Sequence, residues 1–215
     1  GMETIFFRFD KFALGSLKNT NALGFYTLAF NSSELGAKLV SPGVVKVAYP
    51  TFCKLQDRRE KLSEAYTLVN YFLVRVLVPI ALIFVLLGDD LILSLYGRRW
   101  LPSVEVLKVL SLHALLAPIF ENMKQLFYAK GMLTEVIKLR TIQLAIFAPL
   151  MVSMVKLFGI IGAAMVLDLN DIVGVIVGLY LLRRQIKLNL KEIYLYPFLA
   201  GIGTIFVFAK VVDCL

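Results

Sequence analysis

Long and nearly uninterrupted runs of apolar residues constrain this chain more than any other feature. The stretch AYTLVNYFLVRVLVPIALIFVLL, residues 65–87, is one of several that approach or exceed the roughly 20 apolar residues needed to cross a bilayer as a helix. Hydrophobic residues make up 59% of the chain and charged residues 18%, whereas soluble domains have about 45–50% and about 25%. This excess is too large for one core, so the sequence predicts an integral membrane protein.

The spacing of the apolar runs predicts an all-α, polytopic protein with about six or seven transmembrane helices. A membrane barrel would show segments of about ten alternating residues, whereas these runs are longer and continuously apolar. Residues 88–103 have the pattern of a short amphipathic connector. We expect one domain, residues 1–215, with spans at 4–17, 22–49, 65–87, 104–128, 136–157, 159–182 and 193–212.

Lysine and arginine residues at the ends of these spans predict the orientation of the chain. Thirteen of them fall at the ends that include the N-terminus and the loops 54–64, 129–134 and 183–192, against five at the opposite ends. Cytoplasmic loops of membrane proteins carry such an excess. We therefore expect a multi-pass protein of the inner (cytoplasmic) membrane. Because the net charge of +8 gathers in these loops, we do not expect nucleic-acid binding.

Polar residues recur on one face of the second expected span. Asn31, Glu34, Lys38 and Ser41 follow one another at spacings of three or four residues, which places them on the same side of a helix. A charge that faces lipid at mid-bilayer costs about 2.5–3.5 kcal/mol on insertion scales. The pattern therefore indicates either an intrahelical Glu34–Lys38 pair or the wall of a hydrophilic cavity. The cavity is favoured because other spans repeat the feature.

Three further spans contain ionisable residues. Arg75 lies too far from either end of its span for its side chain to reach water easily. Glu121 and Lys124 lie nearer the expected cytoplasmic end of the fourth span. Their position is therefore also compatible with side chains that lie at the membrane–water interface. Asp168 and Asp171 are three residues apart in the sixth span, and two carboxylates so close repel each other when both are ionised. This pair indicates either a proton or cation site or hydrogen bonds to a neighbouring helix.

The remaining reactive residue types predict no catalytic or metal centre. His113 lies within an apolar helical pattern and is expected to be a packed core residue. Cys53 and Cys214 are far apart and lack the spacing of a metal site, a redox motif or a disulfide framework. The sequence contains no P-loop, no cluster of metal ligands and no nucleophile elbow. We therefore expect no enzymatic activity, no metal and no cofactor.

Four stretches in sequence resemble polysaccharide and O-antigen flippases. DKFALGSLKNTNALGFYTLAF, residues 10–30, is similar to the pattern that opens each half of these proteins. PGVVKVAYPTFCKLQDRREKL, residues 42–62, resembles the end of the second helix of a half. LILSLYGRRWLPSVEVLKVLSL, residues 91–112, and GIIGAAMVLDL, residues 159–169, resemble a connector and a helix start. The flippases belong to the multidrug/oligosaccharidyl-lipid/polysaccharide exporter superfamily.

The resemblance implies one lobe, the second, of a MATE-like two-lobe transporter. Such proteins flip polyprenyl-pyrophosphate-linked oligosaccharides across the cytoplasmic membrane for the export of surface polysaccharides such as the O-antigen of lipopolysaccharide. The implied partners are the lipid bilayer, the lipid-linked oligosaccharide and a first lobe, supplied by a missing segment or by a second chain. Two alternatives stay open: a multidrug or cation antiporter of the same superfamily, and a non-transporting half-protein or fragment.

In a flippase, the pyrophosphate and sugar headgroup needs a polar groove because it cannot enter hydrocarbon. Cationic side chains in the groove would pair with the phosphates. We expect the polar residues to turn inward and line one shared cavity. The candidates for substrate binding are Lys38, Arg75, Asn31, Glu34, Lys124 and Glu121, and the candidates for ion coupling are Asp168 and Asp171.

Overall fold

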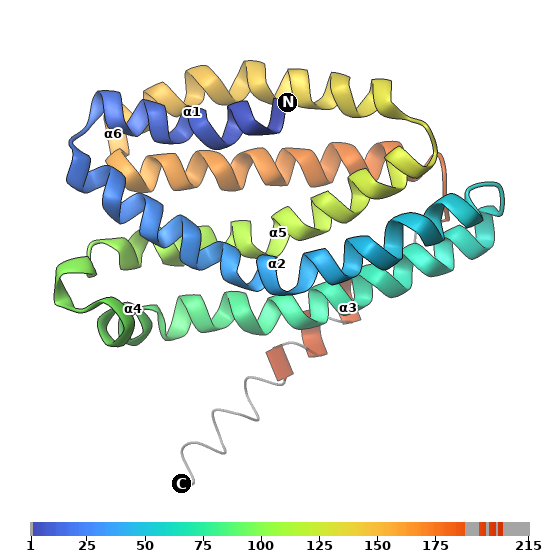
Figure 1. Ribbon diagram of the computed structural model, residues 1–215, viewed down its shortest axis with the longest axis horizontal. Helices are drawn as coiled ribbons and strands as arrows, with labels where there is room; N and C mark the ends of the chain where they lie inside the picture. The colour runs from blue at the N-terminus through green and yellow to red at the C-terminus, as the bar shows by residue number, and fades with distance from the viewer. Residues whose placement is uncertain (1, 188–193, 197, 201, 204–215) are drawn as a thin grey trace, which may run out of the picture.

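The computed structural model describes residues 2–187, 194–196, 198–200 and 202–203, and it is a bundle of helices that lie side by side (Figure 1). No strand occurs in this part of the chain. The all-α class predicted from the sequence is confirmed. The elements are α1 (Met2–Leu17), α2 (Thr20–Leu55), α3 (Arg59–Leu86), α4 (Gly88–Tyr96), the 3-10 helix η1 (Arg98–Trp100), α5 (Ser103–Ala129) and α6 (Leu133–Leu182).

Helix α6 consists of two antiparallel arms that meet at Gly159. This glycine has φ 64° and ψ −135°, a conformation that is essentially restricted to glycine. The chain reverses there, and Figure 1 shows the two arms running back along the bundle. We call them the first arm, residues 133–158, and the second arm, residues 160–182. The turn coincides with the first residue of the second of the two spans expected here, 136–157 and 159–182.

The polar segment 54–64, expected as a loop, is mostly helical. α2 continues to Leu55 and α3 begins at Arg59, so only residues 56–58 lie outside the two helices. Charged side chains on these helix ends can reach water, so the helices can continue past the apolar spans. Figure 1 shows the α2–α3 turn, the α5–α6 turn and the end of α6 at one end of the bundle. The seventh expected span, 193–212, falls largely outside the described residues.

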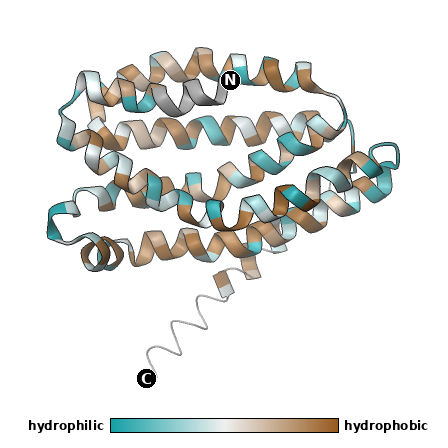
Figure 2. Ribbon diagram, viewed as in Figure 1, coloured by the Kyte–Doolittle hydropathy of each residue, from teal (hydrophilic) through white to brown (hydrophobic). Residues whose placement is uncertain are grey.

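Three of the described helices are long and apolar enough to cross a membrane: α3, α5 and α6, the last with two arms. The shorter α1 and the more polar α2 are not among them. Large apolar side chains such as Leu39, Leu157 and Ile176 are exposed on the outside of the bundle, and Figure 2 shows hydrophobic residues along every helix. Because lipid is the medium in which such a surface is stable, the chain is a multi-pass helical membrane protein.

The centre of the bundle is α5, which packs against α2, α3 and α6. Two glycines of the second arm of α6, Gly174 and Gly178, allow this close approach. A Cβ atom at Gly178 would overlap the sulfur of Met123, and one at Gly174 would crowd the ring of Phe120. The two glycines have the spacing G-x-x-x-G, and small residues at this spacing let membrane helices pack closely.

Candidate functional site

Four helices bring ionisable groups together in the interior of the bundle. The phenol of Tyr26 on α2 donates a hydrogen bond of 2.7 Å to Oδ2 of Asp10 on α1. Nδ1 of His113 on α5 lies 2.5 Å from Oδ2 of Asp171 on the second arm of α6. Asp168 lies one turn before Asp171. We call these five residues the buried polar cluster, because none of them is more than 7% exposed.

The position of the cluster along the helices places it deep in the membrane. His113 is ten residues into α5, so at 1.5 Å per residue it lies about 15 Å from the start of that helix. The hydrocarbon core of a bilayer is about 30 Å thick. An ionisable group near the middle of it is expensive unless it is paired, and such groups mark transport pathways or proton relays. Asp10 is paired with Tyr26 and Asp171 with His113, so both of these carboxyl groups have a partner.

Asp168 is the member of the cluster with an open hydrogen-bonding position. Its Oδ1 atom is buried and has no hydrogen-bond partner among the described residues. His113, Asp171 and Tyr26 are all close enough to Asp168 for electrostatic interaction. A carboxylate oxygen in this setting can accept a proton or contact a small cation. The cluster therefore has the composition that proton or cation exchange requires.

A charged pair on α2 lies between the cluster and the outside of the bundle. Nζ of Lys38 is 2.8 Å from Oε2 of Glu34, and the two side chains are 57% and 22% exposed. Glu34 is in turn close enough to His113 for electrostatic interaction. Asn31, one turn earlier, is exposed. Both sequence interpretations of this face are thus compatible with the structure: Glu34 and Lys38 pair within the helix, and the pair also borders the cluster.

Arg75 is exposed on α3 and does not reach the buried polar cluster. Its Nη1 atom donates a hydrogen bond of 2.7 Å to the phenol oxygen of Tyr71, one turn away, and the guanidinium lies 5.8 Å from the centre of the same ring. Gly36 of α2 packs against Ile80 of α3. Because the helices are antiparallel, Arg75 and Lys38 lie within about one helical turn of each other in depth.

Glu121 and Lys124 form a second polar group nearer the other end of α5. Lys124 is almost fully buried, and its Nζ lies 2.5 Å from Oε1 of Glu121. Arg140, on the first arm of α6, lies 3.8 Å from the same carboxylate oxygen. Both cations lie near the face of the Phe120 ring, at 5.6 Å and 4.7 Å from its centre. Lys124 is therefore engaged in helix packing in this conformation.

The residues predicted from the sequence thus fall into three groups: the aspartates of the buried polar cluster, the exposed face of α2 and α3, and the Glu121–Lys124 group. Four cavities of the bundle are lined by residues other than these candidates. Within the described part of the chain, none of these four cavities is lined by a candidate residue, and contact of the candidates with substrate stays a prediction. Within the described residues, no three His, Cys, Asp or Glu side chains are placed to hold a metal ion.

The sequence interpretation missed three members of the buried polar cluster: Asp10, Tyr26 and His113. His113 was expected to be a packed core residue; it is buried, but it also pairs with Asp171. A signal was present in Asp10, because an ionisable residue in the middle of an apolar span marks a functional position by default. Nothing in the sequence indicates that Tyr26, sixteen residues away, is its partner.

Comparison with known proteins adds to this picture of a membrane bundle with a polar interior. Residues 2–105 match a family described as polysaccharide biosynthesis protein. The resemblance to polysaccharide proteins is confirmed. The teichuronic acid biosynthesis protein TuaB of Bacillus subtilis is 26% identical over 201 residues, which cover 91% of this chain and 42% of TuaB.

Two further relatives come from other surface-polysaccharide systems. The lipopolysaccharide biosynthesis protein WzxC of Escherichia coli is 24% identical over 178 residues, 80% of this chain and 35% of WzxC. An uncharacterised membrane protein in the cps region of Klebsiella pneumoniae is 21% identical over 176 residues, 82% of this chain and 36% of that protein. The chain therefore spans less than half the length of each of these relatives. No solved structure matches it significantly.

Proposed function

We propose that this chain is one lobe, the second, of a transporter that flips lipid-linked oligosaccharides across the cytoplasmic membrane. The observation that supports this most is the buried polar cluster, which lies at mid-membrane depth in a chain related to polysaccharide biosynthesis proteins. A packing role alone would not need three carboxylates among four helices. Transport of a bound headgroup involves no covalent chemistry, so the proposal requires no catalytic centre.

Lys38 and Arg75 would bind the pyrophosphate of the substrate. Both are exposed on this chain, at similar depth, on neighbouring helices. In a two-lobe transporter, the substrate cavity lies between the lobes, so its wall is an exposed surface of each lobe alone. Cationic donors bind phosphate oxygens by charge-assisted hydrogen bonds, and Arg can do so in a bidentate manner. Glu34 and Asn31, on the same helix as Lys38, would contact sugar hydroxyls.

The buried polar cluster would couple this movement to a proton or cation. A proton or cation bound at Asp168 changes the charge next to the His113–Asp171 contact, which joins α5 to α6. A change that stabilises one packing of these helices more than another shifts the population between inward-facing and outward-facing states. Glu34 and Lys38 lie between the cluster and the bundle surface and would carry the ion to it.

A cation or multidrug antiporter is the second candidate, and one observation favours it. The buried polar cluster contains three carboxylates, Asp10, Asp168 and Asp171, and carboxylates are also the groups that would bind a cationic cargo. The two candidates differ in the expected role of Arg75 and Lys38. An anionic cargo needs these cations, whereas a cationic cargo is repelled by them.

The test is complementation of a deletion strain by the full-length protein that contains this chain. The accumulation of lipid-linked oligosaccharide on the cytoplasmic side is measured for the unaltered protein and for R75A, K38A and K46A. Lys46 is another exposed cation of α2 and lies outside the proposed site, so it serves as the matched control. Loss of a charge-assisted contact of about 1.5–3 kcal/mol predicts export reduced by about tenfold or more in the first two variants.

Two outcomes would contradict the proposal. If the full-length protein fails to relieve the accumulation, the flippase assignment is wrong. If it relieves the accumulation but R75A, K38A and K46A export equally, Lys38 and Arg75 do not bind the phosphates. Protection of cells against cationic dyes without any effect on glycan export would favour the antiporter.

A further inference from the structure

The short helix α4 lies across the end of the bundle that is opposite the α2–α3 turn. It follows the last residue of α3 by two positions and connects, through η1, to the start of α5, so it joins two membrane-spanning helices. Figure 1 shows α4 nearly end-on, whereas α3 and α5 are seen from the side. A helix that lies across the spanning helices runs along the membrane surface. Because the charge pattern assigns the other end of the bundle to the cytoplasm, we expect this surface to be that of the outer leaflet.

The apolar side chains of α4 gather on one side of the helix. Ile92 is buried in the core of the bundle, and Asp90 and Ser94, two residues before and after it, fall on the opposite, exposed side. Leu95 and Tyr96 follow Ile92 by three and four residues and so lie on its side, yet they are 67% and 42% exposed. An apolar side toward the spanning helices and a polar side away from them is typical of a helix in the membrane interface.

Two adjacent arginines follow α4 in η1. Arg98 and Arg99 are exposed, and within the described residues neither guanidinium has a hydrogen bond or an ion pair. The next residue, Trp100, fixes η1 to the bundle, because its ring meets that of Phe25 on α2 edge-on, with 5.8 Å between the ring centres. Tryptophan is enriched at membrane–water interfaces, where its ring lies among the headgroups. The two guanidinium groups are therefore held at the level of the lipid headgroups.

The acidic residues of this region leave the charge of the two arginines uncompensated. Oδ2 of Asp89 lies 2.6 Å from Nζ of Lys108 on α5, and Glu105 is also close enough to Lys108 for electrostatic interaction. Asp90 is at the other end of α4 from η1, and the helix rises about 9 Å between Asp90 and Tyr96. Acidic and basic groups are thus separated along α4, with the positive charge at the η1 end.

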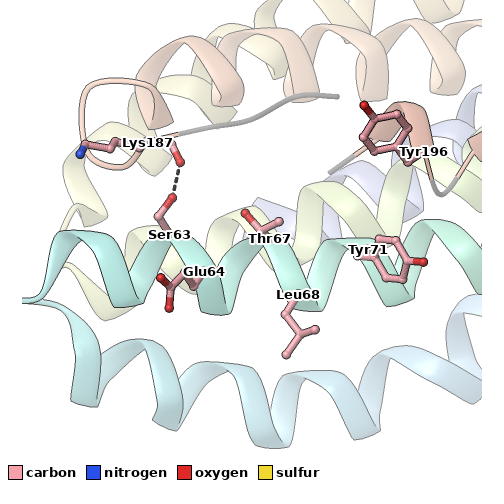
Figure 3. A pocket seen from close by; sticks show the side chains of 7 residues that line it. All are labelled: Ser63, Glu64, Thr67, Leu68, Tyr71, Lys187 and Tyr196. Atoms are coloured by element: carbon pink, nitrogen blue, oxygen red, sulfur yellow. Dashed lines mark hydrogen bonds between the residues drawn. The ribbon is translucent and has the colours of Figure 1, made fainter. Parts of the chain in front are cut away.

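The other end of the bundle differs in the charges around its cations. Figure 3 shows the cavity of about 520 Å³ that Lys187 lines there, but Nζ of Lys187 pairs with Glu60 at 3.1 Å, and Glu64 lines the same cavity. Two adjacent arginines also occur at this end, in the stretch DRRE, residues 57–60, where an acidic residue stands on either side of them. These cations are balanced locally, whereas those of η1 are not.

We propose that α4 and η1 bind the headgroup of an anionic phospholipid of the outer leaflet. Leu93, Leu95 and Tyr96 contact the upper part of its acyl chains. Arg98 and Arg99 bind its phosphate by charge-assisted hydrogen bonds, which a guanidinium can form in a bidentate manner. A zwitterionic headgroup also carries a phosphate, but its own cation offsets the attraction, so the anionic lipid is preferred. The site depends on the membrane location of the chain and not on what the protein transports.

Trp100 provides the probe for the test, because it is the only tryptophan of the sequence and stands next to Arg99. The full-length protein is placed in vesicles with equal amounts of phosphatidylglycerol and phosphatidylcholine, one of which carries bromine on its acyl chains. Bromine quenches tryptophan fluorescence on contact, and subtraction of the emission of W100F leaves the signal of Trp100. From the attraction of basic residues to anionic lipid, we expect phosphatidylglycerol to occupy this contact at least about fivefold more than phosphatidylcholine.

Matched variants separate a specific site from overall charge. R98Q/R99Q removes two positive charges at η1, and R58Q/R59Q removes the same charge at the other end of the bundle. All four arginines are exposed, so both variants are expected to fold, which their melting temperatures check. We expect the preference for phosphatidylglycerol to vanish in R98Q/R99Q and to persist in R58Q/R59Q. No preference in the unaltered protein, a preference kept in R98Q/R99Q, or an equal loss in both variants would overturn the assignment.

The depth of the bromine gives a second measurement. Bromine near the headgroup is expected to quench Trp100 more strongly than bromine near the chain ends, because η1 lies in the interface. Stronger quenching by the deep bromine would contradict this location, and no quenching at either depth would show that another part of the protein covers η1. If undecaprenyl phosphate added in an amount equal to the protein displaces phosphatidylglycerol from Trp100, the arginines bind the carrier lipid and the phospholipid assignment is wrong.

Discussion

His113 on α5 and Asp171 on the second arm of α6 lie 2.5 Å apart in the interior of the bundle. Both side chains are almost completely buried, so each satisfies a polar group that water does not reach. The contact also joins the two helices whose packing must change if the bundle alternates between two conformations. It is therefore both a structural link and the centre of the candidate site.

The first prediction concerns the strength of this contact. H113A and D171A each leave one buried polar partner without its hydrogen bond, which costs about 1–3 kcal/mol. We expect each single variant to lower the free energy of unfolding in detergent by that amount. In the double variant the second change should cost little, because the partner is already gone. Unfolding curves of the four proteins measure the coupling; strictly additive losses would show that the two side chains do not interact.

The second prediction compares two tyrosines. Y26F removes the hydrogen bond to the buried Asp10, so we expect a loss of about 1–3 kcal/mol in the free energy of unfolding. Y71F removes a hydrogen bond of the same length, but to the exposed Arg75, where water can replace it. Its effect on stability should stay within about 0.5 kcal/mol. Equal losses in the two variants would mean that the Asp10–Tyr26 contact is not buried as described.

The third prediction tests how closely α5 and α6 pack. G178A places a methyl group where the sulfur of Met123 lies, and we expect it to destabilise the protein by about 1–3 kcal/mol. M123A removes that obstacle, so G178A should cost much less in the M123A background. Thermal unfolding of the two single variants and the double variant measures the rescue. A G178A loss that M123A does not reduce would contradict the packing of these two residues.

The fourth prediction concerns the turn between the arms of α6. G159A places a Cβ on a backbone conformation that only glycine adopts readily, so a loss of about 1–3 kcal/mol is expected. Gly43 is helical with open space around it, and G43A should be neutral or stabilising by up to about 1 kcal/mol. Melting temperatures of the two variants measure the difference. A neutral G159A would mean that the chain does not reverse at this residue in the way the structure has it.

Hydropathy predicts the helical class and the approximate position of most helices because lipid imposes the length of each apolar run. α5, Ser103–Ala129, lies within one residue of the expected span at either end. α2 extends from Thr20 to Leu55, well beyond the expected 22–49, because its polar end remains favourable as helix outside the apolar region. The G-x-x-x-G spacing of Gly174 and Gly178 is typical of close helix packing, but only the structure identifies Met123 and Phe120 as the neighbours of these glycines.

The candidate site was less accessible to sequence reasoning. Asp168 and Asp171 could be recognised because carboxylates in an apolar helix are expensive and need a reason. Their partner His113 lies 58 residues away from Asp171, and no local pattern encodes a contact between different helices. The free-energy cost of a charge in an apolar helix identifies single residues as candidates. Which of these residues lie together depends on how the helices pack.

The most direct test of the transport proposal is a flipping assay with the purified full-length protein in vesicles. A labelled polyprenyl-pyrophosphate-linked oligosaccharide is placed in both leaflets, and its accessibility to a reagent outside the vesicle is followed over time. We expect the protein to expose the inner-leaflet pool and D171N to slow this exchange by about tenfold or more. A rate no different from that of protein-free vesicles would contradict the proposal.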